Sequence, residues 1–277
     1  MSDNKAISER EEVARKILES GERMSADDTF HFACYPGISC FNVCCADVNI
    51  VLTPLDIVQM SRALDMSTSD FLARHTLVPF TEDQKLPVVF LRMNEDEKRT
   101  CPFVTEKGCS IYEARPWPCR MYPLGQASPA DPDTQGRGFF FLMKEDHCRG
   151  FEEDKEWTAG QWIEDQGADR YEESGKLFRE ILHHPYLQQR SLDPARMEMF
   201  YMGCYDLDKF RRFIFESKFL SRFKVSDDEL NAVRSSDMDA LRFAFRWLKF
   251  ALFGELTMEI NRDNLSARER EALEKKK

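Results

Sequence analysis

Eight of the nine cysteines of this 277-residue chain fall in one segment, between Cys34 and Cys148. Their spacing is C-x5-C-x3-C-C, then C-x7-C-x9-C, then one further cysteine. Thiolate sulfur binds zinc and iron tightly, and such a site takes about four ligands. Since these ligands would come from distant parts of the sequence, metal binding would be coupled to folding. We therefore predict as metal ligands Cys34, Cys40, Cys44, Cys45, Cys101, Cys109, Cys119 and Cys148.

The spacing leaves the number of sites open. Eight thiols could complete two four-coordinate sites, or hold one cluster with thiols to spare. Cys40 and Cys44 would share a face on a helical turn, whereas the adjacent Cys44 and Cys45 would point about 100° apart. Zinc and an iron–sulfur cluster both accept four cysteines, and neither standard ferredoxin spacing is present. The ninth cysteine, Cys204, lies in an apolar helical pattern and is predicted to be an inert core thiol.

Composition favours a cytoplasmic protein in which these thiols stay reduced. The N-terminal residues have no apolar stretch typical of a signal peptide, and no run of 18 apolar residues predicts a spanning helix. Reduced thiols favour metal binding over disulfides, although a disulfide-stapled interaction protein remains an alternative. The formal net charge of −10 lacks the basic footprint of a nucleic-acid binder, so no nucleic-acid partner is expected.

The pattern of elements predicts an α+β chain that is mostly α-helical. Residues 1–29 are expected to hold an N-terminal helix, and residues 30–154 a small cysteine-rich metal module with few short strands. Residues 155–277 are expected to form a helical C-terminal part that packs on the module and ends in a charged tail. Helix starts are signalled by Thr53-Pro54 and by Ser67 with Asp70, and strands by residues 86–91 and 139–143.

The C-terminal part shows helical periodicity, with Leu207, Phe210 and Ile214 on one face. A second strong helical pattern covers residues 239–253, with Arg242, Arg246 and Lys249 on one side. We interpret it as a helix that packs into the core and keeps a solvated basic face. The alternative is a helix that lies on a membrane surface or binds a protein partner.

The cysteine blocks resemble a known bacterial family. Cys34-x5-Cys40-x3-Cys44-Cys45 and Cys101-Pro102-Phe103, followed by Gly108-Cys109-Ser110-Ile111-Tyr112-x2-Arg115-Pro116-x2-Cys119-Arg120-x-Tyr122-Pro123, are similar to the YkgJ-like cysteine-cluster family, described as a zinc- or iron-chelating domain. Thr53-Pro54-x-Asp56-Ile57 and Cys148-Arg149-Gly150 extend the resemblance, which covers about residues 30–150.

The resemblance implies metal chelation by cysteine, with zinc or an iron–sulfur cluster as the cofactor. A flagellin lysine N-methylase belongs to the same broad family, so a protein-modifying enzyme that uses S-adenosylmethionine is a second hypothesis, with a protein substrate. The chain has no Gly-rich nucleotide loop that would support it. Around the thiols, Arg115 and Arg120 could offset negative charge, while His31 and His147 are spare candidate ligands.

Overall fold

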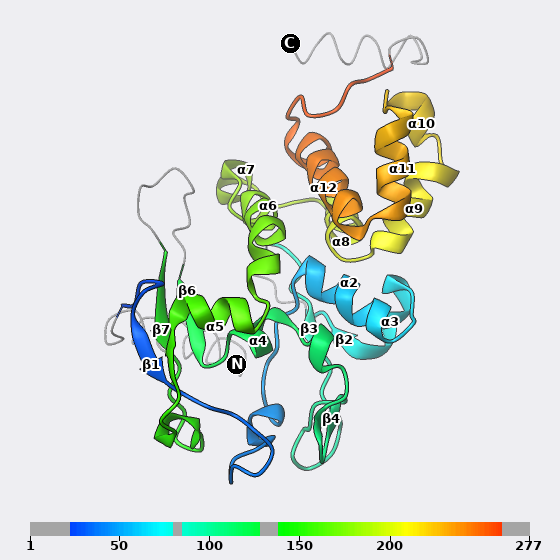
Figure 1. The fold of residues 1–277 in the computed structure, drawn as a ribbon. Coiled ribbons are helices and arrows are strands. Elements are labelled where there is room, and N and C mark those ends of the chain that lie inside the picture. Colours follow the sequence, from blue (N-terminus) through cyan, green and yellow to red (C-terminus); the bar gives the residue numbers. More distant parts are fainter. Residues whose placement is uncertain (1–22, 80–84, 128–137, 262–277) are drawn as a thin grey trace.

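The structure is a computed structural model that describes residues 23–79, 85–127 and 138–261. It is an α+β protein made mostly of helices, as the sequence predicts (Figure 1). The N-terminal helix expected within residues 1–29 and the charged tail lie largely outside the described residues. Within those residues, no helix is long and apolar enough to cross a membrane.

Two helices follow the first cysteines, and both begin where the sequence signals them. Helix α2 (Pro54–Ala63) has a complete capping box between Thr53 and Asp56, with Pro54 in its first turn. Helix α3 (Thr68–His75) is capped by the Ser67 side chain, which accepts a hydrogen bond from the Asp70 backbone N–H. These caps satisfy backbone N–H groups that the first helical turn leaves free.

The strands form four two-stranded antiparallel pairs. Strand β1 (Thr29–His31) pairs with β8 (Glu156–Thr158), which closes the cysteine segment end to end. The others are β2 (Thr76–Leu77) with β3 (Phe90–Leu91), β4 (Val104–Thr105) with β5 (Gly108–Cys109), and β6 (Leu124–Ala127) with β7 (Phe139–Leu142). The strand predicted over 139–143 is therefore present, whereas the one predicted over 86–91 shrinks to its last two residues.

Short helical turns connect these pairs: η1 (Val43–Cys45), η2 (Tyr112–Ala114), α4 (Trp117–Met121) and η3 (Gly150–Glu152). Helices then dominate the rest of the described chain: α5 (Ala159–Asp165), η4 (Asp169–Tyr171), α6 (Glu172–Leu182), α7 (Pro185–Gln189), α8 (Pro194–Cys204), α9 (Leu207–Glu216), α10 (Phe219–Arg222), α11 (Asp227–Ser235), α12 (Asp237–Leu248) and η5 (Lys249–Phe253).

Helix α12 is the centre of the C-terminal part and packs against α6, α8, α9 and α11. Its polar side is ion-paired rather than merely solvated: Arg242 meets Glu173, Arg246 meets Glu229, and Lys249 meets Glu180. The core-packing interpretation of this helix is therefore right, and the alternative of a membrane-surface helix is wrong. Helix α9 buries Leu207, Phe210 and Ile214, as its periodicity predicts.

Two hydrophobic cores divide the molecule. The larger core joins α2 and α3 to helices α6–α12, so it contains residues from both sides of position 155. The smaller core gathers Phe30 and Phe32 beside β1, Leu124 of β6 and Trp162 of α5. In Figure 1 the smaller core occupies the lower left, around β1, β6, β7 and α5.

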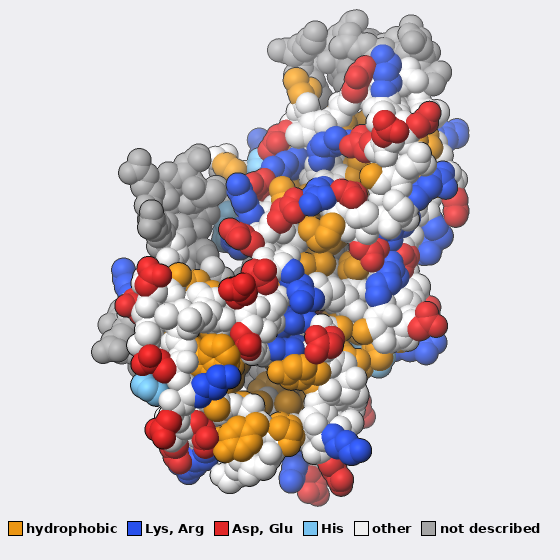
Figure 2. All heavy atoms as spheres, in the orientation of Figure 1, with side chains coloured by type: hydrophobic (Ala, Val, Ile, Leu, Met, Phe, Trp, Pro, Cys, Tyr) orange, Lys and Arg blue, Asp and Glu red, His pale blue; other side chains and the backbone are white. Residues whose placement is uncertain are grey.

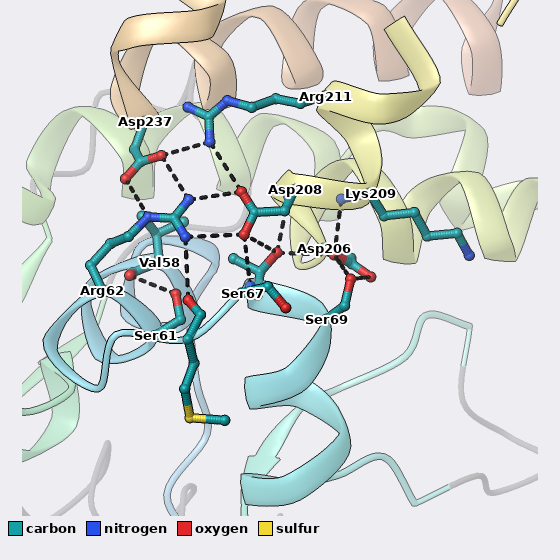
Figure 3. Close-up of polar contacts among 12 residues, drawn as sticks. Val58, Ser61, Arg62, Ser67, Ser69, Asp206, Asp208, Lys209, Arg211 and Asp237 are labelled. Atoms are coloured by element: carbon teal, nitrogen blue, oxygen red, sulfur yellow. Dashed lines mark hydrogen bonds and ion pairs between the residues drawn. The ribbon is translucent and has the colours of Figure 1, made fainter. Parts of the chain in front are cut away.

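A polar network ties α2 and α3 to the C-terminal helices (Figure 3). Arg62 at the end of α2 forms ion pairs with Asp208 of α9 at 2.9 Å and with Asp237 of α12 at 3.2 Å. The Asp208 carboxylate also accepts the Thr68 backbone N–H, 2.8 Å away. Burial alone would raise the pKa of Asp208, but these hydrogen bonds and nearby guanidinium charges lower it to about 2.

Candidate metal centre

The cysteines sit on short elements and turns at one end of the molecule. Cys34 follows β1, Cys40 lies in a turn, Cys44 and Cys45 form η1, and Cys101 precedes the β4–β5 hairpin that contains Cys109. Cys119 lies in α4, and Cys148 lies two residues before η3. All nine cysteines are free thiols. In Figure 1, the label β4 marks this lower end, and Figure 2 shows a hollow there with hydrophobic-coloured side chains, a class that includes cysteine.

Backbone hydrogen bonds hold the Cys44–Cys45 turn against the segment around Cys101. The Cys101 N–H donates to the Cys45 carbonyl at 2.8 Å, and Ala46 pairs with Thr100. One residue further, the Asp47 N–H donates to the Arg99 carbonyl, and the two side chains form an ion pair at 3.1 Å. Asp47 and Arg99 both have positive φ, 51° and 49°. This local turn geometry therefore places Cys45 and Cys101 side by side, although they are 56 positions (101 − 45) apart in the sequence.

A second set of contacts brings Cys148 to the first cysteine block. The Arg149 backbone N–H donates to the Cys40 sulfur at 3.2 Å, and the Ala33 N–H donates to the Gly150 carbonyl at 3.1 Å. A Cβ atom on Gly150 would lie 2.5 Å from the Phe32 ring and 2.8 Å from the Ala33 oxygen. Only glycine allows this approach, which explains the glycine two residues after Cys148.

Contacts with the segment around Cys148 define a first set of four thiols. Arg149 bonds to Cys40, Ala33 next to Cys34 bonds to Gly150, and Cys44 lines a pocket with Glu145 and His147. The pKa of the Cys34 thiol is raised to about 11, first by burial and then by three neighbouring thiols, those of Cys44, Cys40 and Cys148. We call these four cysteines the loop group: Cys34, Cys40, Cys44 and Cys148.

A second set surrounds Cys119. The pKa of this thiol is raised to about 12, first by burial and then by negative charges that include those of Cys101 and Cys109, although part of the residue stays exposed to solvent. The pKa of Cys45 is raised above its usual range by Cys44, burial, Cys101 and Cys119. We call the second four cysteines the core group: Cys45, Cys101, Cys109 and Cys119.

The two groups meet at the adjacent cysteines of η1. A hydrogen bond from the Cys45 thiol to the Cys44 sulfur lowers the pKa of Cys44 to about 7 and raises that of Cys45. Cys44 is thus the first of the pair to become a thiolate, the form that binds metal. Cys44 lines a pocket with Glu145 and His147, whereas the Cys45 carbonyl accepts the Cys101 N–H, so the two adjacent cysteines face different segments.

Arg115 and Arg120 lie behind the core group and are both buried. The positive charge of Arg115 opposes the burial that raises the pKa of Cys109. The Arg120 guanidinium donates to the carbonyls of Glu113, Arg115 and Gln166. Arg120 therefore fixes the backbone on both sides of Cys119 by hydrogen bonds, a role that its place in the sequence did not reveal.

The structure adds two residues to those predicted. The buried Asp56 carboxylate accepts the Trp117 N–H at 2.7 Å, which anchors the start of α4 two residues before Cys119. The Tyr122 hydroxyl is buried without a hydrogen bond of normal geometry to the described residues. Burial and the nearby Cys148 thiol raise the pKa of Tyr122. Both residues stand in the quoted family motif, which was the only sequence signal for them.

The candidate histidines lie beside carboxylates. His31 is 3.9 Å from Glu156, and His147 is 3.4 Å from Glu145. His147 and Cys44 line the same shallow pocket, whereas the contacts of His31 are with β8. Cys204 is 1% exposed in α8 and packs in the larger core, which confirms the prediction of a core thiol.

The donor set fits a thiophilic metal. Eight free thiols in two sets of four match the four-cysteine coordination of zinc and of iron–sulfur clusters. A backbone N–H directed at Cys40 and a buried hydroxyl beside Cys148 are donors that a metal-bound thiolate accepts. Within the described part of the chain, no three Cys, His, Asp or Glu side chains are already arranged to hold a metal ion, so binding would require side-chain rotation.

Residues 33–156 match the family model CxxCxxCC, whose description reads “Putative zinc- or iron-chelating domain”. This match agrees with the resemblance of the cysteine segment to that family. The matched region begins beside Cys34 and ends in β8, so it contains both thiol groups. The match supports metal binding by this segment in general. No curated protein and no solved structure matches the chain.

Proposed function

We propose that this protein binds zinc or iron, the iron either alone or in an iron–sulfur cluster, through the eight cysteines of the two thiol groups. The observation that carries the proposal is that free thiols from three separate stretches of the family segment are neighbours in the fold. A bound metal would supply either a structural cross-link or, in an iron–sulfur cluster, electron transfer.

The position of the thiols favours a cross-link between the two cores. Cys101 and Cys109 pack against the larger core, and Cys148 packs against the smaller one. Ligands from both sides would make the metal part of the folding free energy of the whole module. The expected location is the cytoplasm of a bacterium, where thiols stay reduced.

Anaerobic purification followed by elemental analysis and a visible absorption spectrum tests the proposal. Stoichiometric zinc without colour would indicate a structural site, and iron with acid-labile sulfide and brown colour would indicate a cluster. Folded protein with neither metal would contradict the proposal. Cys204→Ala is the matched control, because this cysteine lies outside both thiol groups and should leave the metal content unchanged.

A further inference from the structure

The two thiol groups differ in how firmly the fold holds their ligands, and this difference carries an inference that rests on the proposed function. The core group is attached to regular structure. Cys109 lies in β5 with Val104 of β4 opposite, and Cys101 is hydrogen-bonded to Cys45. Cys119 lies in α4, whose start is held by Asp56 and whose backbone is held by Arg120.

The anchors of the core group reach deep into the molecule. Asp56 is 0% exposed and belongs to α2, while Arg120 is 1% exposed. At its other end α2 carries Arg62, which is paired to α9 and α12. Displacing Cys119 would therefore disturb contacts that continue into the C-terminal helices.

The loop group has weaker attachment. The turns between Cys34 and Cys44 are held mainly by short-range backbone bonds, such as Phe41 N–H to the Ile38 carbonyl at 2.9 Å. Cys34 and Cys44 are exposed, as is Cys119 of the core group, so the two groups differ in attachment rather than in exposure. The Cys148 N–H likewise bonds only three residues back, to Glu145. Such segments open locally at a small fraction of the global unfolding free energy.

Solvent reaches one member of the loop group, Cys44, through a shallow pocket. Its lining includes Cys44 together with Asp47, Glu145 and His147. A small chelating molecule can approach Cys44 there without any movement of the helices. Access through this pocket and weak attachment therefore coincide at Cys44.

Metal leaves a thiolate site when its ligands detach one after another. A ligand that the fold holds in place binds the metal again before the next one detaches, so metal release from a firmly held site is slow. We propose that the eight thiols form two metal sites of different lability: a structural site made by the core group, and an exchangeable site made by the loop group. The exchangeable site would take zinc or iron from, or give it to, a small thiol or chelating partner.

A chelator challenge tests this division. Protein produced with zinc supplied is mixed with EDTA, and the zinc that stays on the protein is counted over time. We expect about two zinc ions per chain, since each takes four thiolates. One should leave about 10-fold faster or more, since loss of supporting contacts weakens metal affinity by about 10- to 100-fold.

Variants assign the two phases. Cys40→Ser and Cys148→Ser should each abolish the fast phase, leave the slow phase unchanged, and lower the thermal unfolding temperature less than Cys109→Ser does. Cys109→Ser should abolish the slow phase and lower the unfolding temperature. Cys204→Ala is the control and should alter neither the number of zinc ions nor either rate.

The outcomes separate the inference from the proposed function. Two outcomes would overturn the two-site assignment while metal binding stands. One is a single zinc ion per chain. The other is a single release phase that every loop-group and core-group variant alters equally. In the Cys40→Ser variant only the core group should still hold zinc. If this zinc left faster than it does in the slow phase of the parent protein, the assignment would also be overturned. Absence of any bound metal in folded protein would instead contradict the proposed function itself.

Discussion

At the scale of single residues, the candidate centre depends on a buried cation that donates hydrogen bonds to backbone carbonyls. Arg120 is 1% exposed, and its guanidinium is satisfied by backbone carbonyls: that of Arg115 at 2.9 Å, that of Gln166 at 2.8 Å, and that of Glu113. The ring of the buried Tyr171 lies 6.0 Å from it. Such an arrangement fixes loop geometry, because each carbonyl loses its partner if the arginine is shortened.

Arg120→Met should lower the free energy of unfolding by about 3 kcal/mol or more, since it leaves several buried carbonyls without donors. Urea denaturation followed by circular dichroism measures the change. Arg149→Met is the control: this arginine is exposed, its ion pair with Glu152 is a surface contact, and a change below about 1 kcal/mol is expected. Equal effects of the two substitutions would show that Arg120 has no special role in the fold.

At the scale of elements, the closeness of η3 to the β1 strand depends on Gly150. Gly150→Ala should destabilise the protein by about 1–3 kcal/mol, because the new Cβ overlaps the Phe32 ring and the Ala33 carbonyl. It should also reduce metal retention by the loop group, since Cys148 would be moved. Gly175→Ala within α6 is the control; its Cβ meets only the end of the Arg179 side chain at 3.3 Å, so stability should stay equal or rise. Unchanged stability of Gly150→Ala would contradict the packing argument.

The network that joins α2 to α9 and α12 predicts a pH dependence. The folded-state pKa of Asp208 is about 2, below the ordinary value of 3.8. The stabilisation is therefore complete above about pH 4 and is lost as the pH falls toward 2, where the folded state also takes up the proton. Asp208→Asn should flatten the fall in unfolding temperature over this range. Glu164→Gln, at an exposed position of α5, should leave the profile as it is. A profile of Asp208→Asn identical to that of the parent protein would refute the assignment.

Short sequence patterns were sufficient to predict the elements that are determined by interactions between neighbouring residues. Thr53 and Pro54 predicted the start of α2, because an N-cap and a first-turn proline depend only on neighbouring residues. The periodicity of α9 predicted its buried face for the same reason. The β1–β8 pairing was not predictable, since Phe30 and Trp157 are opposite each other only in the folded chain. The resemblance identified the cysteines but not their grouping, which depends on the long-range contacts of Cys101 and Arg149. Their assignment as metal ligands and the boundary near residue 155 stay predictions.

At the scale of the whole molecule, the thiols lie beside two cores: Cys101 and Cys109 pack against the larger one and Cys148 packs against the smaller one. The larger core continues through α2 into the C-terminal helices, and the smaller one lies around β1, β6, β7 and α5. Trp117 of α4 packs against both cores. Metal bound by both groups would therefore add a second connection, through Cys148 on one side and Cys101 with Cys109 on the other.

Hydrogen exchange with and without metal tests this connection. Removing the metal should increase backbone exchange in η1, the β4–β5 hairpin and the β1–β8 pair, because their positions depend on the thiols. It should leave α12 protected, since that helix is held by aromatic packing and by ion pairs to α6 and α11. The same treatment of Cys40→Ser should change only the β4–β5 hairpin and η1, because its loop group has already lost its metal. An equal increase of exchange throughout the chain would mean that metal stabilises the protein globally. Unchanged exchange would mean that bound metal does not connect the two cores.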